Sequence, residues 1–154
     1  DRFLMNLYMD YPSMADEKRL LSELIVGQVG DKLDLSKVGA VMTPERLLQL
    51  QLITAHVAID ERVVQYALDI VRLSREFAGI EMGAGVRAGM ALLRCAKACA
   101  LMSGRDYAVP DDVRYVAVDV LRHRISLTAD FMIDGYQIEQ VIGQLLNAVS
   151  APRS

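Results

Sequence analysis

The sequence predicts a mainly α-helical fold with one or two short strand pairings. Apolar residues recur at helical spacing along most of the chain, and the segments that carry them begin with capping residues and end near glycine. Only one run, residues 3–11, is continuously apolar in the manner of a buried strand. With 154 residues, of which 53% are hydrophobic, the chain is long enough for one domain with a core.

The run from Phe3 to Tyr11 suits a strand that is covered on both faces in a parallel sheet, and Pro12 ends it. No other part of the chain offers several comparable strands to pair with it. The chain also begins at Asp1 with no polar lead-in. We therefore expect an orphan strand whose sheet is made by other sequence, in a chain that is a piece of a longer protein.

The first half of the remaining chain predicts three helices. The first covers about residues 15–28, with acidic side chains in its first turn, and an irregular connection follows over residues 29–42. The second begins at Thr43-Pro44-Glu45, where a hydroxyl caps the helix and proline takes its first position. After a short extended stretch at 57–59, Asp60 caps the third helix, and Gly79 closes that helix.

The second half predicts three more helices. One covers residues 86–102 and stops at Ser103-Gly104. Another opens at Val109-Pro110, with two aspartates in its first turn. Residues 122–136 are expected to be extended or irregular, and a last helix covers residues 138–149. The expected total is about six helices.

The bulk properties exclude several classes of function. The net charge is −3 and aromatic residues make up 6%, so no overall field favours nucleic acid or an anionic membrane. The longest uncharged stretch, residues 47–59, is too short to span a bilayer, and no secretory leader is recognisable. We expect a cytoplasmic protein with no membrane span and no nucleic-acid partner.

The stretch EMGAGVRAG at residues 81–89 is the strongest candidate for chemistry. An arginine at the start of a helix is unfavourable by roughly 0.3–1 kcal/mol, unless an anion is shared between Arg87 and the unpaired N–H groups of the helix end. Arg94 and Lys97 continue the basic face. Taken alone, this pattern fits a solvated basic face with glycine turns better than a phosphate site, and both readings stay open.

The other reactive side chains do not form a catalytic set. Cys95 and Cys99 are expected to fill the core, because no further Cys or His completes a metal motif. His123 is expected to make a structural hydrogen bond, and Asp111-Asp112 to cap a helix. The sequence contains no phosphate loop of the type G-x-x-x-x-G-K-[ST]. We expect no metal site in this chain.

Several stretches together resemble the C-terminal part of the MoxR family of AAA+ ATPases. They are DRFLMNLYMDYP, VMTPERLLQLQ, GAGVRAGMALLRCAKACALMSGRDYAVPDDVR and VLRHRI, in the family's order over residues 1–125. The resemblance implies that residues 1–12 are the last strand region of a nucleotide-binding domain. It further implies that residues 13–150 form a helical lid and that residues 151–154 form a tail.

The resemblance also implies roles for individual residues. Arg2 matches an arginine that completes the ATP site of a neighbouring subunit, and Arg87 matches a sensor arginine that contacts the γ-phosphate in its own subunit. Gly83 and Ala84 would lie against the nucleotide. Gly85 and Val86 depart from the family's usual serine and proline, which leaves the direction of the arginine open.

For the full-length protein, the resemblance implies ATP and Mg²⁺ as cofactors and a homo-oligomeric ring, expected to be a hexamer. It also implies partners with a von Willebrand A-type domain and chaperone-like remodelling or maturation of partner proteins. The chain alone should not hydrolyse ATP. The alternative is a non-catalytic helical interaction or regulatory module. A nucleic-acid-binding helical domain ranks below both, because the basic stripe is short.

Overall fold

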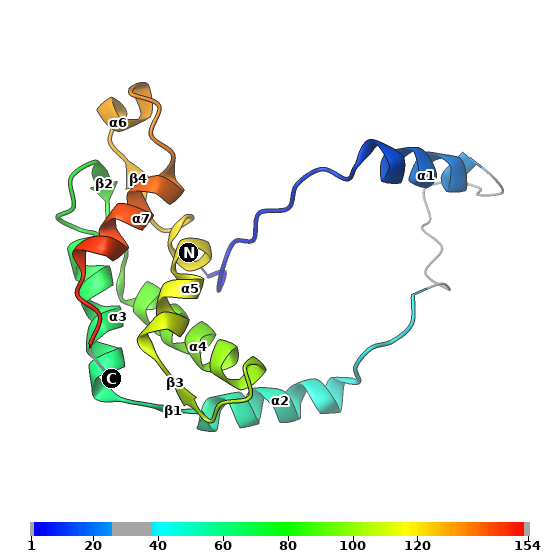
Figure 1. Cartoon of the computed structure of the whole chain (residues 1–154), viewed down its shortest axis with the longest axis horizontal. Coiled ribbons are helices and arrows are strands. Elements are labelled where there is room, and N and C mark those ends of the chain that lie inside the picture. Colours follow the sequence, from blue (N-terminus) through cyan, green and yellow to red (C-terminus); the bar gives the residue numbers. More distant parts are fainter. Residues whose placement is uncertain (1, 26–37, 153–154) are drawn as a thin grey trace.

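The computed structural model describes residues 2–25 and 38–152, which are mainly helical, with four very short strands. Figure 1 shows their arrangement. In chain order the elements are α1 (Met14–Ile25), α2 (Pro44–His56), β1 (Ala58–Ile59), α3 (Glu61–Leu73), β2 (Ile80–Met82), α4 (Val86–Met102), β3 (Tyr107–Ala108), α5 (Pro110–Leu121), β4 (Ser126–Leu127), α6 (Ala129–Ile133) and α7 (Ile138–Ala148). The mainly helical class is confirmed.

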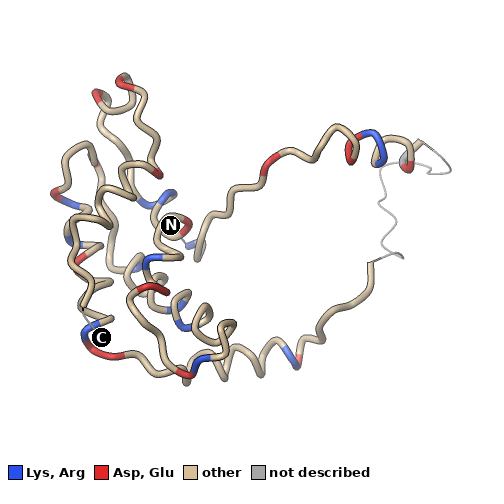
Figure 2. Tube along the Cα trace, viewed as in Figure 1, with Lys and Arg blue, Asp and Glu red and all other residues tan. Residues whose placement is uncertain are grey.

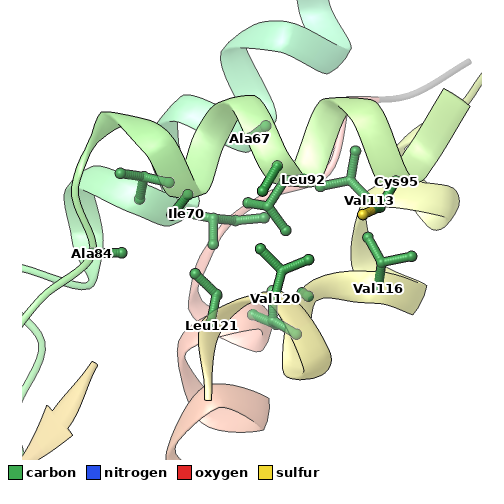
Figure 3. Close-up of a cluster of buried hydrophobic side chains, with 14 of the residues drawn as sticks. Ala67, Ile70, Ala84, Leu92, Cys95, Val113, Val116, Val120 and Leu121 are labelled. Atoms are coloured by element: carbon green, nitrogen blue, oxygen red, sulfur yellow. The ribbon is translucent and has the colours of Figure 1, made fainter. Parts of the chain in front are cut away.

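The core lies where α3, α4, α5 and α7 meet (Figure 3). The side chains that α3 buries follow helical spacing and are Val63, Tyr66, Ala67, Ile70 and Val71. Helix α4 buries mostly small residues, among them Ala88, Ala91 and Ala96. Small side chains let helix axes approach closely, and α4 makes its most extensive contact with α5.

Two short strand pairs tie the connections together. β1 and β3 are parallel, with Ala58 opposite Tyr107. β2 and β4 are antiparallel, with Ile80 opposite Leu127 and an irregularity before Met82. Because β2 comes directly before α4, its pairing with β4 helps to fix the backbone that leads into that helix.

The predicted helix boundaries that rest on capping residues are confirmed, except that the third helix ends at Leu73 and not at Gly79. The Thr43 hydroxyl accepts a hydrogen bond from the Arg46 N–H at 3.3 Å, and the Asp60 carboxylate accepts one from the Arg62 N–H at 2.8 Å. Helix α4 covers residues 86–102 as predicted, and Gly104 follows it with φ +74°. These boundaries are set by local chemistry, which is why the sequence predicts them.

The expectation that residues 122–136 are extended or irregular is correct only in part. The segment contains β4 but also α6, which the Thr128 side chain caps. A helix of five residues is too short to produce a periodic apolar pattern, so the sequence gives no signal for it. Most of the predicted connection at 29–42 lies outside the described residues, as does the end of the first predicted helix.

Residues 3–11 form no strand in this structure. A strand exists only through hydrogen bonds to a neighbour, and none of the described strands pairs with this segment. The Asn6 N–H donates instead to the carbonyl oxygen of Asp119 at 2.8 Å. Most of the apolar side chains here are exposed, including Phe3 at 77% and Tyr11 at 90%. That other sequence completes a sheet here remains a prediction.

The first two helices, α1 and α2, lie outside the core. In Figure 1, α1 lies well apart from the core, and its Leu20, Leu21 and Ile25 side chains are exposed. Helix α2 buries no residue, but the Lys97 ammonium of α4 donates to the Ala55 carbonyl oxygen at 3.0 Å near its end. Within the described part of the chain, no helix is both long enough and apolar enough to cross a membrane.

Candidate functional site: an arginine-lined hollow

The loop before α4 is tied to the end of α3 by a buried serine. The Ser74 hydroxyl donates to the Val71 carbonyl oxygen at 2.7 Å and accepts from the Ala84 N–H at 2.9 Å. Arg75 Nε donates to the Ala84 carbonyl oxygen at 3.0 Å. Both backbone groups of Ala84 are therefore bonded within the fold, so the start of α4 has a defined position.

Gly83 is required by the close approach of two backbones. A Cβ atom at this position would lie 2.5 Å from Arg75 Cα and 2.6 Å from the Ser74 carbonyl oxygen, which is too close for any side chain. Gly85 differs, because a Cβ there would meet open space. Gly85 is the N-cap of α4, and no side chain accepts from the first N–H groups of this helix.

We expect Gly83→Ala to lower the free energy of unfolding by about 2 kcal/mol, since the added methyl group must displace backbone. The matched control is Gly89→Ala in α4. Its Cβ would meet Val71 Cγ2 at 3.8 Å, an ordinary contact, and alanine should gain about 0.5–1 kcal/mol there through its helix propensity. Urea unfolding of both variants measures this, and equal stability of the two would contradict the tight approach at Gly83.

Helix α4 presents two arginines to one hollow. Arg87 and Arg94 are seven residues apart, about two helical turns, and both are exposed. They line a hollow of about 570 Å³ together with Arg2 and Arg124, and the other described residues of its lining are apolar. In the view of Figure 2, both basic and acidic residues lie near the N-terminal end of the chain. The structure therefore brings Arg2 and Arg87 together.

Hydrogen bonds from Arg124 hold the N-terminal segment beside this hollow. Its Nη1 donates to the carbonyl oxygens of Leu4 at 3.0 Å and Val120 at 2.5 Å, and its Nη2 donates to the carbonyl oxygen of Phe3. His123 Nε2 lies 3.4 Å from the same Phe3 oxygen, in agreement with the expected structural hydrogen bond. The sequence analysis missed this role of Arg124, since its partners lie 120 residues away and no spacing signals them.

The charges of the hollow suit an anion. Burial lowers the pKa of the Arg124 guanidinium, and the nearby Cys95 partly opposes this effect. Guanidinium groups that line one hollow repel one another, and a phosphate group would relieve this repulsion while accepting bidentate hydrogen bonds. Lys97 does not belong to this site, because it is bonded to Ala55.

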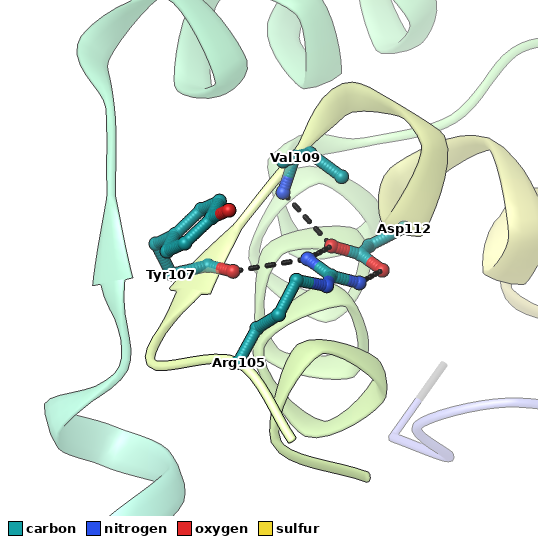
Figure 4. A network of polar contacts seen from close by, with 4 residues as sticks. All are labelled: Arg105, Tyr107, Val109 and Asp112. Carbon is teal, nitrogen blue, oxygen red and sulfur yellow. Dashed lines mark hydrogen bonds and ion pairs between the residues drawn. The ribbon is translucent and has the colours of Figure 1, made fainter. Parts of the chain in front are cut away.

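The stretch GRDYAVPDDV forms a structural ion pair (Figure 4). Arg105 donates to both carboxylate oxygens of Asp112, at 2.9 and 2.7 Å, and also to the Tyr107 carbonyl oxygen at 3.0 Å. The Val109 N–H donates to the same carboxylate at 2.8 Å, which confirms that Asp112 caps α5. Burial alone raises the pKa of Asp112, but the hydrogen bonds from Arg105 and Val109 hold it below its ordinary value.

The other candidate groups show no sign of a second chemical site. Cys95 is buried in the core as expected, and burial raises the pKa of both cysteine thiols. Among the described residues, no three His, Cys, Asp or Glu side chains form a group that could hold a metal ion. A hollow of about 650 Å³ lies beside β1 and β3, but Asp60 and Arg62 on its rim pair with each other.

The fold is that of a lid domain of the AAA type. The family described as AAA lid domain matches residues 72–145. A crystal structure of a candidate ATPase from Cytophaga hutchinsonii superposes with a TM-score of 0.81 at 27% identity, over 99% of this chain and 47% of that one.

Three curated relatives are similar over nearly the whole chain. Protein YeaC of Bacillus subtilis is 32% identical over 99% of this chain and 46% of its own length. Chaperone MoxR1 of Mycobacterium tuberculosis is 32% identical over 99% of this chain and 41% of its own length. Protein MoxR of Methylorubrum extorquens is 30% identical, with coverages of 99% and 49%. The chain belongs to the MoxR family of AAA+ ATPases, and it spans about half the length of these relatives.

Proposed function

We propose that this chain is the lid and subunit-interface portion of a ring-forming MoxR-type ATPase. The full-length protein would couple ATP hydrolysis to chaperone-like remodelling or maturation of partner proteins. The observation that carries the proposal is the hollow that Arg2, Arg87, Arg94 and Arg124 line together. Such a cluster at the start of a lid helix suits the phosphates of a nucleotide.

In this proposal Arg87 contacts the γ-phosphate. ATP, when bound, supplies a transferable phosphoryl group on which negative charge must be neutralised. The Arg87 head is exposed and sits one residue into α4, so both the guanidinium and the positive helix end are available to an anion. Residues outside this chain would bind Mg²⁺ and orient the attacking water. Gly83 and Ala84 would contribute mainly by holding the turn, since both Ala84 backbone groups are bonded.

The attachment of the turn before α4 to the end of α3 would let the lid respond to a nucleotide. Ser74 and Arg75 bind Ala84 directly, so a force on the start of α4 is transmitted to α3 and from there to the core. A contact that Arg87 makes with ATP but not with ADP would therefore change the angle of the whole lid. Domain rotation of this kind is a common way to couple hydrolysis to movement.

The structure favours a shared target for Arg2 and Arg87. From the sequence, Arg2 is expected to act on the neighbouring subunit and Arg87 on its own. Both line one hollow of one chain, which supports the alternative that they contact the same phosphate groups from the same side. In that alternative, if Arg2 contacts the ATP of the neighbouring subunit, Arg87 contacts the same ATP.

Mixed rings of the full-length protein test this arrangement. Arg2→Ala subunits are mixed with subunits whose phosphate loop is inactivated, and the ATPase rate is followed across mixing ratios. If Arg2 acts in trans, mixed rings regain activity, because some intact ATP sites face an intact arginine. The experiment is repeated with Arg87→Ala subunits. If these mixed rings also regain activity, Arg87 acts on the same neighbouring ATP site as Arg2. Failure of rescue for Arg2 would refute a role in trans.

The assembly and partners are also proposals. We propose a hexameric cytoplasmic ring whose partners include proteins with a von Willebrand A-type domain. The exposed apolar side chains of α2, among them Leu48 at 60% and Leu52 at 64%, offer contact area for the rest of the longer protein. The same feature favours the second candidate, a non-catalytic interaction module. If the longer protein neither binds nor hydrolyses ATP, the interaction module is the correct function.

A further inference from the structure

The N-terminal segment is attached to the lid through backbone hydrogen bonds and through the Met5 side chain, which packs against the core. The side chains of Phe3 and Leu4 are 77% and 47% exposed, so they contribute little apolar contact. Their carbonyl oxygens accept from Arg124, and the Asn6 N–H donates to the Asp119 carbonyl oxygen at 2.8 Å. Hydrogen bonds from a charged donor are stronger than those from a neutral one, so Arg124 contributes strongly to the attachment of residues 3 and 4.

Arg124 is itself held in place. Its Nη1 also donates to the Val120 carbonyl oxygen in α5, and the guanidinium is half-buried against the core beside Cys95. One side chain therefore connects the end of α5 to the backbone of residues 3 and 4. Arg2 directly precedes Phe3 in the chain, and it lines the hollow with Arg87.

We propose that Arg124 is a positioning residue, which clamps the segment carrying Arg2 to the lid so that Arg2 and Arg87 present one rigid anion site. This inference rests on the proposed function of the hollow. It goes beyond that function because it makes Arg2 a part of the lid. Movement of the lid then carries both arginines together.

The first test is amide hydrogen exchange in the 154-residue chain with Arg124→Met. We expect exchange of the Asn6 amide to rise about tenfold or more, as follows from loss of hydrogen bonds to a charged group, while amides within α4 keep their rates. Arg114→Met is the matched control, because Arg114, which lies in α5, likewise donates to a distant carbonyl oxygen, that of Leu146. Arg124→Lys, which keeps the charge and donors, should restore part of the protection. An unchanged Asn6 rate in Arg124→Met would overturn the clamp.

The second test is a double-mutant cycle on binding of inorganic triphosphate at low ionic strength. Arg2→Ala should weaken binding about tenfold in the otherwise unchanged chain, but hardly at all in the Arg124→Met background, because the segment is already released. Additive effects of the two substitutions would show that Arg124 does not position Arg2. If triphosphate does not bind the unchanged chain, the proposed function of the hollow fails, and the exchange experiment still decides whether the clamp exists.

Discussion

Replacement of Arg87 by alanine is expected to reduce the ATPase turnover of the full-length protein about 1000-fold and to leave the fold intact. Arginines that neutralise charge on a transferred phosphoryl group contribute effects of this order. The Arg87 side chain is exposed at the start of α4, so its loss removes no core packing. Turnover and thermal unfolding are measured on the same preparations.

Two further variants sharpen this experiment. Arg87→Lys keeps the charge but loses the two-pronged head, so it should recover only part of the activity. Arg72→Ala removes an exposed arginine from α3, outside the hollow, and should leave turnover unchanged. If Arg87→Ala hydrolyses ATP as fast as the unchanged protein, the sensor role assigned to Arg87 is wrong.

Replacement of Asp112 by alanine is expected to lower the free energy of unfolding by about 3 kcal/mol. Its carboxylate side chain is only 8% exposed and pairs with Arg105, whose side chain is 27% exposed. Breaking such a pair leaves a charge poorly compensated and also removes the cap of α5. Because Arg105 is partly solvated, the loss should lie at the lower end of the range for buried pairs.

The neighbouring Asp111 provides the control, because it is exposed in the same helical turn. Asp111→Ala should cost less than about 1 kcal/mol, which is the usual size of a helix-dipole effect. Chemical unfolding of both variants gives the comparison. Equal losses would mean that the ion pair in Figure 4 adds little to stability.

The same carboxylate predicts a dependence of stability on pH. The folded pKa of Asp112 lies below its ordinary value, so its contribution is complete above the unfolded pKa of about 3.9 and is lost as the pH falls through the folded value. We expect the unchanged chain to lose stability below about pH 4, and Asp112→Ala to lose less over that interval. Urea midpoints between pH 6 and pH 3 measure this difference.

The strand expected at residues 3–11 shows a limit of sequence patterns. Continuous apolar character records that a segment is suited to burial, but the hydrogen bonds of a strand come from a partner. The described residues provide none, and the segment is attached instead through Arg124 and Asp119. The pattern therefore indicates that the segment is suited to burial, but it does not identify the strand that would pair with it.

By itself, the sequence determined most of the helices and many of their ends. Thr43, Asp60 and Gly104 act on backbone groups within a few residues, so their effects are local and can be predicted. Only the tertiary structure decided that Arg2 and Arg87 share one hollow. Their approach depends on Arg124, which binds carbonyl oxygens 120 residues away in the chain. Contacts over such distances arise from the packing of whole helices, and no local pattern records them.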